Sequence, residues 1–287
     1  MRLVTFNVGG KDAIGLVKGD QVIDLTKLDK QFDCTMIDLL AGGRARFEQV
    51  RKVAHGVHGH FSLSEVKLAA PILRPRKFLA LGLNYESHIQ EAAAKGVEIP
   101  KHQFWFNKQV TCVNGPYDPI VKPWISDAVD YEAELAFVIG ETCRHVKAER
   151  AEDVIAGYMI CNDVSVRDYQ RHSPTFTMGK SFDTHGPIGP WIVTSDELSD
   201  ANSLDVRCWV NGDLRQSANT SEFRYSCGEM IAYLSSAFTL EPGDIITTGT
   251  PSGVGFAMDP PSFLKVGDTV KIEIDGIGHI ENKVVAE

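Results

Sequence analysis

The chain has 287 residues, 43% of them hydrophobic and 23% charged, which is typical of a globular protein with one large domain or one large and one small domain. Its formal net charge of −9, without a basic cluster, argues against nucleic acid or an anionic membrane as a partner. No apolar run approaches the roughly 20 residues of a membrane span, and "MRLVTFNVGGKDAIG" lacks the apolar core of a signal peptide.

Residues 1–70 predict a small α+β N-terminal domain. Its expected strands are "RLVTFNV", "AIGLVKG" and "QVIDLT", followed by helical stretches around "TMIDLLAG" and "RFEQVRKVA". Residues 71–77 predict an extended linker, because Pro71 and Pro75 disfavour helix at and before themselves. The "HGVHGH" segment has the composition of a metal site, but it lies among glycines, and we expect no functional metal there.

Residues 78–287 predict a strand-rich domain, with helices near 85–95, 164–171 and 227–238. Glycine, proline and aspartate separate the predicted strands, as turns require. These strands are "KFLALGL", "QFWFNKQ", "ELAFVIG", "YMICND", "GPWIVT", "LDVRCWVNG", "DIITTG", "TVKIEIDG" and "GHIENKVV". The expected fold is mainly β with some α, a β-sandwich or roll with helices at its edge. The segment "PSGVGFAMDPPSFLKVGD" predicts a long loop, for which a position over a site is one role.

The cysteines are dispersed and form no C-x-x-C pair. This spacing predicts reduced thiols in a cytoplasmic protein, with neither a disulfide framework nor a zinc ribbon. The six residues are Cys34, Cys112, Cys143, Cys161, Cys208 and Cys227.

The stretch "GLNYESHIQEAAAKG" predicts a helix with Asn84 as N-cap and Gly96 as its stop. His88 and Glu91 are three residues apart, so they lie on one helix face. A carboxylate that orients a histidine and stabilises its protonated form gives a general base near neutral pH. The alternative is a solvated face on which Glu91 pairs with Lys95.

The stretch "DYEAELAFVIG" places Glu132 and Glu134 at the head of an apolar strand. Side chains two apart in a strand point to the same face, so these carboxylates lie side by side. Like charges at that separation repel unless a positive charge lies between them. The alternative is a solvated strand edge that carries two glutamates without a function.

In "CNDVSVRDYQRH", a strand leads into Asp163, which is a good helix N-cap. On the predicted helix, Arg167 and Gln170 share a face with Asp163. The alternative is an N-cap aspartate with an ordinary Asp–Arg pair. Combined with Glu132 and Glu134, Asp163 completes a set of three carboxylates. Oxygen ligands without histidine or cysteine select a hard divalent cation, Mg²⁺, Mn²⁺ or Ca²⁺.

Two later segments carry further candidates. Lys180 lies in "FTMGKSFDTHGPIGPW", where it either is solvated or stabilises negative charge that develops on a bound anion. Thr250 follows the strand in "GDIITTGTPSGVG", which is either an ordinary turn or a carboxylate-binding loop. His172 and His185 flank Arg167 and Lys180, and they are weaker candidates for lining the site.

The motifs "GLNYESHIQE", "DYEAELAFVIG", "CNDVSVRDYQ", "TMGKSFDTHGPIGPW", "VNGDLRQ" and "PGDIITTGTPSGVG" together resemble the fumarylacetoacetate hydrolase family over about residues 75–285. The resemblance implies a mixed β-sandwich roll, a homodimer, and a His88–Glu91 dyad on a mobile lid helix. It implies that Mg²⁺ or Mn²⁺ is held by Glu132, Glu134 and Asp163. The substrate-holding candidates are Arg167, Gln170, Lys180 and Thr250, together with Tyr85 at the start of the predicted helix.

Within that family, "FAMDPPSFLKVGD" looks closest to the 2,4-diketo-3-deoxy sugar acid hydrolases. The expected activity is Mg²⁺-dependent hydrolysis of a C–C bond in a 2,4-diketo acid (an acylpyruvate), which releases pyruvate and a carboxylic acid. His88, oriented by Glu91, would deprotonate the water that attacks C4, and Lys180 and the metal would stabilise the pyruvate enolate.

Two alternatives remain. The first is related chemistry through the same enolate: decarboxylation of oxaloacetate, or keto–enol or diene isomerisation of a dicarboxylate. The second is a metal-binding module without catalytic activity, which the His88–Glu91 pair disfavours.

Overall fold

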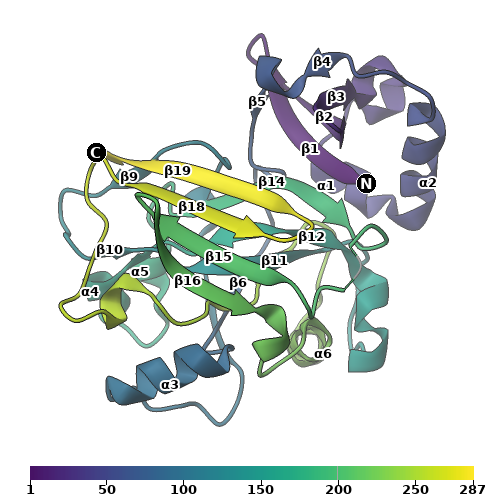
Figure 1. The fold of residues 1–287 in the computed structure, drawn as a ribbon. Coiled ribbons are helices and arrows are strands. Elements are labelled where there is room, and N and C mark those ends of the chain that lie inside the picture. Colours follow the sequence, from purple (N-terminus) through teal and green to yellow (C-terminus); the bar gives the residue numbers. More distant parts are fainter. Residues whose placement is uncertain (199) are drawn as a thin grey trace.

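The computed structural model describes residues 1–198 and 200–287, and it has a mixed α/β fold (Figure 1). Within this described part, the largest sheet follows the order β4-β3-β2-β1-β14-β12-β11-β17-β6-β7, with β5 attached to β1 and β8 attached to β14. A second sheet has the order β16-β15-β18-β19-β9. The fold class expected from the sequence, mainly β with some α, is confirmed.

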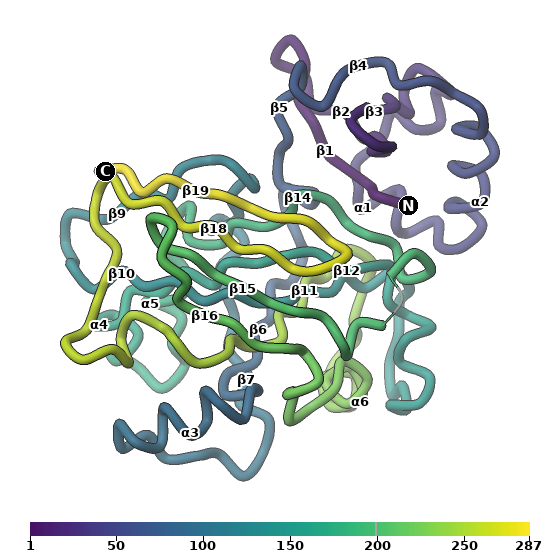
Figure 2. Tube along the Cα trace, in the orientation of Figure 1, coloured from purple at the N-terminus to yellow at the C-terminus, as the bar shows by residue number. Residues whose placement is uncertain are grey.

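Residues 1–70 form one end of the large sheet and two helices beside it (Figure 2). Strand β1 pairs with β14, with Leu3 opposite Ile192, so the sheet continues from this region into the rest of the chain. The separate N-terminal domain and its 71–77 linker stay predictions. The elements are β1 (Arg2–Val8), β2 (Lys11–Lys18), β3 (Gln21–Asp24), α1 (Met36–Ala41), α2 (Gly43–Ala54), β4 (Phe61–Ser62) and β5 (Lys67–Leu68).

The middle of the large sheet carries the buried core. All seven residues of β11 (Ala133–Ile139) are buried, because other layers cover both of its faces. Strand β11 pairs antiparallel with β12 (Ile155–Asn162), which sets Ala133 opposite Asn162. This register brings Glu132, which precedes β11, next to Asp163, which follows β12. The remaining strands are β6 (Phe78–Gly82), β7 (Phe104–Asn107), β8 (Val113–Asn114), β14 (Gly186–Thr194) and β17 (Ile245–Thr247).

The second sheet packs on the large one as a sandwich (Figure 1). Burial alternates along β15 and β18, as expected for strands with one face in the core and one in solvent. Its buried residue Ile272 belongs to the same hydrophobic cluster as Leu135 of the large sheet. The strands are β15 (Asp205–Val210), β16 (Asp213–Asn219), β18 (Thr269–Ile274), β19 (Gly278–Ala286) and β9 (Ile120–Lys122), with β10 (Val129–Asp130) and β13 (Ser165–Val166) as a separate pair.

Residues 78–287 contain the helices α3 (Glu86–Ala94), α4 (Arg167–Gln170), α5 (Thr177–Lys180) and α6 (Cys227–Ala237). The prediction that Asn84 caps α3 is wrong, since Tyr85 is the N-cap. Nδ2 of the buried Asn84 instead donates to the carbonyls of Tyr225 and Thr248, and its Oδ1 accepts from the amide of Tyr225, because a buried amide must satisfy both of its ends.

The predicted helix at 164–171 is also shorter than expected. Helix α4 begins at Arg167 with Val166 as its N-cap, so the prediction that Asp163 caps it is wrong. Asp163 is fully buried and pairs with two lysines, because a buried carboxylate requires a positive partner.

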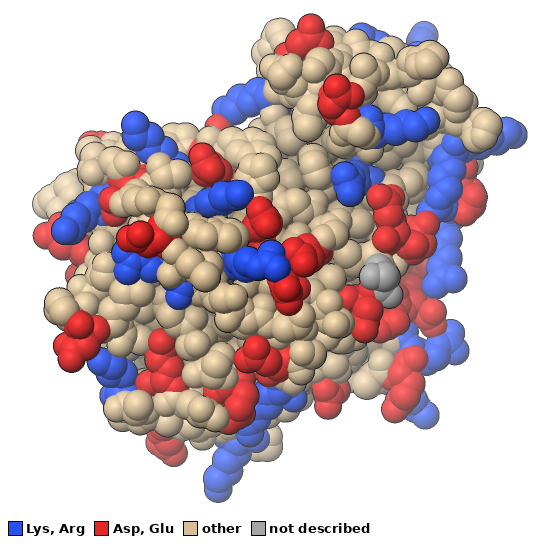
Figure 3. Space-filling model, viewed as in Figure 1, with Lys and Arg blue, Asp and Glu red and all other residues tan. Residues whose placement is uncertain are grey.

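Acidic and basic side chains are mixed on the face drawn in Figure 3. Among the described residues, every helix is too short or too polar to span a bilayer.

Candidate active site

Three carboxylates gather where β11 begins and β12 ends. Glu132, Glu134 and Asp163 are all buried, and each offers an oxygen within 4.8 Å of the others. The amide of Asp163 donates to the carbonyl of Glu132 at 2.9 Å, which extends the β11–β12 pairing by one more hydrogen bond. The sheet register thus joins residues that are distant in the sequence, and the predicted three-carboxylate cluster is present.

Two buried lysines face this cluster. Nζ of Lys180 donates to Oε2 of Glu132 and to Oδ2 of Asp163, at 2.6 Å each. Nζ of Lys108 donates to the other oxygen of Asp163, Oδ1, at 2.7 Å, and also to the carbonyl of Lys180. The sequence interpretation missed Lys108, whose signal was a lysine directly after the aromatic strand "FWFN".

Arg167 binds the cluster from a third side. Its Nη1 lies 2.7 Å from Oε1 of Glu132, and its Nε donates to Oδ2 of the buried Asp130 at 2.8 Å. Asp130 also accepts from the amides of Gly255 and Phe256, at 2.8 and 2.9 Å. Asp130, which the sequence interpretation missed, therefore ties Arg167 to the loop after β17.

The charges around the cluster shift the pKa values of Glu132 and Glu134 in opposite directions. Burial raises the pKa of Glu132, but the charges of Lys180 and Arg167 outweigh it and hold that pKa well below its ordinary value. Burial, with the negative charges of Asp163 and Glu132, holds the pKa of Glu134 well above its ordinary value.

The donor set fits a divalent cation. Among the described residues, the carboxylate of Glu134 has no cationic partner within 4 Å and accepts a hydrogen bond from the amide of Gly249. The three residues offer only oxygen ligands, which hard ions such as Mg²⁺ and Mn²⁺ prefer. Glu132, Glu134 and Asp163 are the residues that would hold such an ion.

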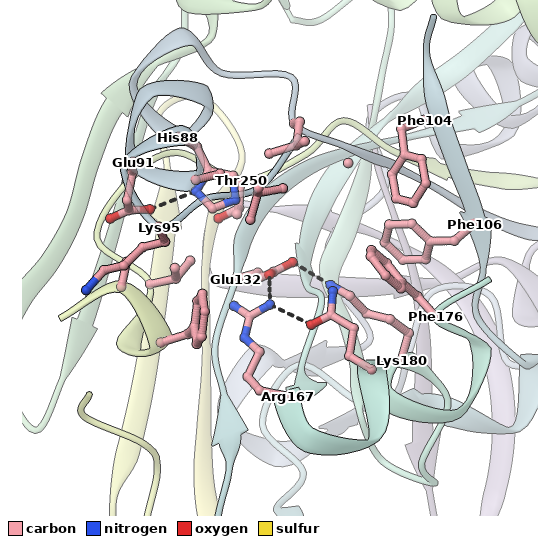
Figure 4. Close-up of a pocket in the computed structure, with 18 of the residues that line it drawn as sticks. His88, Glu91, Lys95, Phe104, Phe106, Glu132, Arg167, Phe176, Lys180 and Thr250 are labelled. Atoms are coloured by element: carbon pink, nitrogen blue, oxygen red, sulfur yellow. Dashed lines mark hydrogen bonds and ion pairs between the residues drawn. The ribbon is translucent and has the colours of Figure 1, made fainter. Parts of the chain in front are cut away.

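A cavity of about 430 Å³ opens over the cluster (Figure 4). It brings together most of the residues predicted from the sequence. Asp163 is not among the lining residues, and its carboxylate is joined to them through Lys180. The predicted residues that line the cavity are His88, Glu91, Glu132, Glu134, Arg167, Gln170, Lys180 and Thr250.

Helix α3 carries the expected His88–Glu91 contact. Nδ1 of His88 lies 2.8 Å from Oε2 of Glu91, and Oε1 of Glu91 accepts from the amide of Gly253 at 3.0 Å. Glu91 thus fixes the imidazole and also joins α3 to the loop after β17. Among the described residues, Nε2 of His88 has no hydrogen-bond partner, so this nitrogen is available to exchange a proton in the cavity.

Gln170 and Thr250 lie on the cavity wall with fixed orientations. Oε1 of Gln170 accepts from Nη1 of Arg167 at 3.1 Å. Oγ1 of Thr250 accepts from Nε2 of Gln216 at 2.7 Å. Gln216 is buried and was missed, because it lies on the polar edge strand β16, which has no apolar pattern.

Three other candidates lie outside the cavity lining. Tyr85 is fully buried against Phe223, with ring centroids 4.9 Å apart, so its role in substrate binding stays a prediction. His172 is exposed, and His185 is buried with its Nε2 2.9 Å from the carbonyl of Val121. The expectation that these two histidines line the site is therefore wrong.

The sequence matches a family profile described as fumarylacetoacetate (FAA) hydrolase C-terminal over residues 77–285. A Xenopus laevis protein described as a mitochondrial oxaloacetate tautomerase is 41% identical over 99% of this chain and 90% of its own length. A Homo sapiens protein with the same description is 40% identical over 99% of this chain and 92% of its own length.

Solved structures show the same fold over the whole chain. The maleylpyruvate hydrolase from Sphingobium sp. SYK-6, in complex with manganese(II) and pyruvate, is 35% identical, with a TM-score of 0.82 over 100% of this chain and 99% of that one. The 5-carboxymethyl-2-hydroxymuconate delta-isomerase from Mycobacterium smegmatis is 33% identical, with a TM-score of 0.77 over 100% of both chains.

Proposed function

Because the chain belongs to the fumarylacetoacetate hydrolase family, we propose that it is a metal-dependent enzyme that interconverts the keto and enol forms of a 2-oxo dicarboxylic acid, with oxaloacetate as the first candidate. The observation that carries this proposal is the likeness, over 99% of the chain, to proteins described as oxaloacetate tautomerases. The sequence interpretation preferred hydrolysis of a diketo acid. The relatives favour the isomerase alternative instead.

The site has the groups that such a proton transfer requires. Nε2 of His88 would accept the proton from C3, and the carboxylate of Glu91 on Nδ1 would stabilise the imidazolium that forms. The electron pair of the C3–H bond becomes the C2=C3 double bond, and the negative charge moves to the oxygen on C2. Lys180 offers its ammonium group to that oxygen, which takes up a proton from water, and the His88 imidazolium returns its proton to water, so that both side chains regain their starting protonation.

The carboxylates Glu132, Glu134 and Asp163 would hold the divalent cation, Mg²⁺ or Mn²⁺. When bound, this ion supplies positive charge that favours the enolate over the keto acid. The manganese(II) in the 35%-identical hydrolase supports a cation of this class.

Hydrolysis of a 2,4-diketo acid is the second candidate function. The observation that favours it is the 35% identity, over the full chain, to a maleylpyruvate hydrolase. Hydrolysis differs from tautomerisation in one requirement, because a water must be held between His88 and the C4 carbonyl for attack.

Rates with two substrate types test the proposal. Ketonisation of enol-oxaloacetate is followed by the loss of enol absorbance, and hydrolysis of an acylpyruvate by release of pyruvate, both with Mn²⁺ or Mg²⁺. We expect kcat/KM for ketonisation to exceed that for hydrolysis by at least ~10-fold, which corresponds to about 1.4 kcal/mol. Faster pyruvate release from an acylpyruvate would promote the hydrolase, and no turnover of any of these acids would leave a metal-binding module.

Assembly and location are part of the same proposal. We propose a homodimer from the family resemblance, which sedimentation of the purified protein tests.

We propose a cytoplasmic location from the cysteines, all six of which are free thiols in the structure. The relatives described as mitochondrial support a mitochondrial location instead. Fluorescence microscopy of the tagged full-length chain, expressed in the organism from which it comes, decides between the two locations.

A further inference from the structure

One wall of the cavity is aromatic. Phe104 and Phe106 lie two residues apart on β7 and therefore point to the same face. Phe176, which precedes α5, packs against both of them, with ring centroids 5.1 Å from Phe104 and 5.9 Å from Phe106. All three rings line the cavity. Figure 4 shows them together on the side opposite His88 and Glu91.

The backbone of Phe176 adopts a conformation that phenylalanine does not favour, and this conformation places its ring in the wall. Phe176 has φ 60° and ψ −4°, in the left-handed region that bulky residues rarely adopt. Leu83, which also lines the cavity, has φ 57°. Strained backbone of this kind concentrates at ligand-binding sites. Since asparagine tolerates this conformation more easily, the aromatic ring at position 176 has a local cost that packing or a ligand must offset.

The wall begins where the charged part of the site ends. Nζ of Lys180 lies 4.8 Å from the ring centroid of Phe106, and the same atom binds Glu132 and Asp163. A 2-oxo acid with its oxygens at the carboxylate–lysine cluster therefore has this wall within reach of its next substituent. The cavity of about 430 Å³ is also larger than a four-carbon acid fills, and its volume lies within the range of about 300–1,000 Å³ common for small-molecule sites.

We propose that Phe104, Phe106 and Phe176 form a subsite for an aryl group on C3 of the substrate, so that arylpyruvates undergo the same keto–enol conversion. This inference rests on the proposed function and extends its substrate class. A flat aryl ring offers edge-to-face or offset-stacked contact to these side chains, which a carboxylate does not. The reaction is unchanged: the C3–H proton goes to Nε2 of His88 and from there to water, the electron pair forms C2=C3, and the oxygen on C2 takes up a proton from water, so no further reactant is consumed.

The test compares phenylpyruvate with oxaloacetate, using the full-length protein with Mn²⁺. Both enols are followed by absorbance, and the ratio of the two kcat/KM values is the readout. In Phe176→Asn, the backbone conformation is retained and the ring is lost. We expect this substitution to lower the phenylpyruvate-to-oxaloacetate ratio by about 10-fold, the scale of one lost apolar contact in a specificity pocket.

Two further variants control for indirect effects. Phe176→Tyr keeps the ring and should keep the ratio. Phe238→Asn removes a half-exposed ring just after α6, outside the cavity, and should also keep it. If Phe176→Asn does not fold, Phe104→Leu replaces it as the variant that removes one ring from the wall.

The outcomes separate this inference from the proposed function. If oxaloacetate is converted but phenylpyruvate is not, or if the ratio is unchanged in Phe176→Asn, the aryl subsite is wrong and the proposed function stands. If neither acid is converted, the proposed function fails, and calorimetric binding of phenylpyruvate with Mn²⁺ decides the subsite. About 10-fold weaker binding to Phe176→Asn would then support the subsite, and equal binding to both proteins would refute it.

Discussion

Nζ of Lys108 lies 2.7 Å from Oδ1 of Asp163, and both side chains are completely buried. This ion pair occupies one oxygen of Asp163, so the other oxygen, Oδ2, is the one that meets Lys180 beside Glu132. Burial lowers the pKa of Lys108, but the charge of Asp163 outweighs it and holds that pKa above its ordinary value. Lys108 is therefore a charged residue that positions Asp163 from behind the cavity.

We predict that Lys108→Met weakens Mn²⁺ binding by about 10–100-fold, the usual effect of losing a partner that orients a metal ligand. The substitution should also lower the free energy of unfolding by up to about 3–5 kcal/mol, because it removes one of the two counter-charges of the buried Asp163 carboxylate and leaves only Lys180. Titration calorimetry and urea unfolding measure the two effects.

Lys77→Met is the matched control for Lys108. Lys77 likewise forms ion pairs with carboxylates, those of Glu241 and Asp244, but it lies away from the cavity and the acidic cluster. Its loss should leave Mn²⁺ affinity unchanged. Unaltered Mn²⁺ affinity in Lys108→Met would show that Asp163 needs no such support.

Removal of the metal should abolish turnover. We predict that chelation with EDTA eliminates activity, that Mg²⁺ or Mn²⁺ restores it, and that Glu134→Ala loses both metal binding and activity. The physical reason is that the three carboxylates are the oxygen ligands that would hold the proposed cation. Glu48→Ala, on the exposed face of α2, is the control. Full activity after exhaustive chelation would exclude a metal role for the cluster.

We predict that His88→Ala lowers kcat by about 10²–10⁴-fold, the scale of lost acid–base catalysis. Mn²⁺ affinity should be retained, because His88 is not one of the three residues proposed to hold the cation, which are Glu132, Glu134 and Asp163. Gln90→Ala alters an exposed residue of the same helix and should leave kcat within a few-fold of the unmodified protein, by the usual tolerance of surface positions. An unchanged kcat in His88→Ala would return the His88–Glu91 pair to a structural role on α3.

Acid stability should depend on His185. Burial lowers the pKa of His185 from 6.5 to about 4, so the unfolded chain binds a proton near pH 6.5 that the folded protein does not bind until about pH 4. Protonation therefore favours the unfolded state in this window, and stability that is present above pH 6.5 is lost as the pH falls towards 4. The difference between the two pKa values corresponds to about 3 kcal/mol.

Urea unfolding at pH 7 and at pH 4.5 measures this contribution. We expect His185→Gln to lose less stability between these two values than the unmodified protein does. His172→Gln, which changes an exposed histidine, should keep the original pH dependence. Equal losses in all three proteins would assign the acid sensitivity to other groups.

The sequence by itself determined the features that depend on short-range spacing. Apolar periodicity located strands such as β11 and β12, because a buried strand of this length is apolar along the chain. The three-residue spacing of His88 and Glu91 was sufficient to predict their contact, since helix geometry alone places them on one face. The two-residue spacing of Glu132 and Glu134 likewise predicted adjacent carboxylates.

Only the tertiary structure decided which distant residues complete the site. Lys108 and Asp163 are 55 residues apart, and no local pattern links them. The three phenylalanines of the cavity wall come from β7 and from the segment before α5, which pack together only in the folded chain. For Asn84, the local pattern gave a wrong prediction. Its preference for a helix N-cap was overridden by tertiary hydrogen bonds to Tyr225 and Thr248.

The sequence predicts some contacts and not others because local backbone geometry and long-range packing are set by different physical factors. Backbone periodicity fixes which neighbours within a few residues can meet, and the sequence displays it directly. Which buried charge meets which counter-charge depends instead on how the sheets and loops pack, because every buried polar group must find a partner wherever the fold supplies one. The three carboxylates and Lys180 were therefore visible as candidates in the sequence, whereas Lys108, which pairs with Asp163, and Asp130, which pairs with Arg167, were found only in the fold.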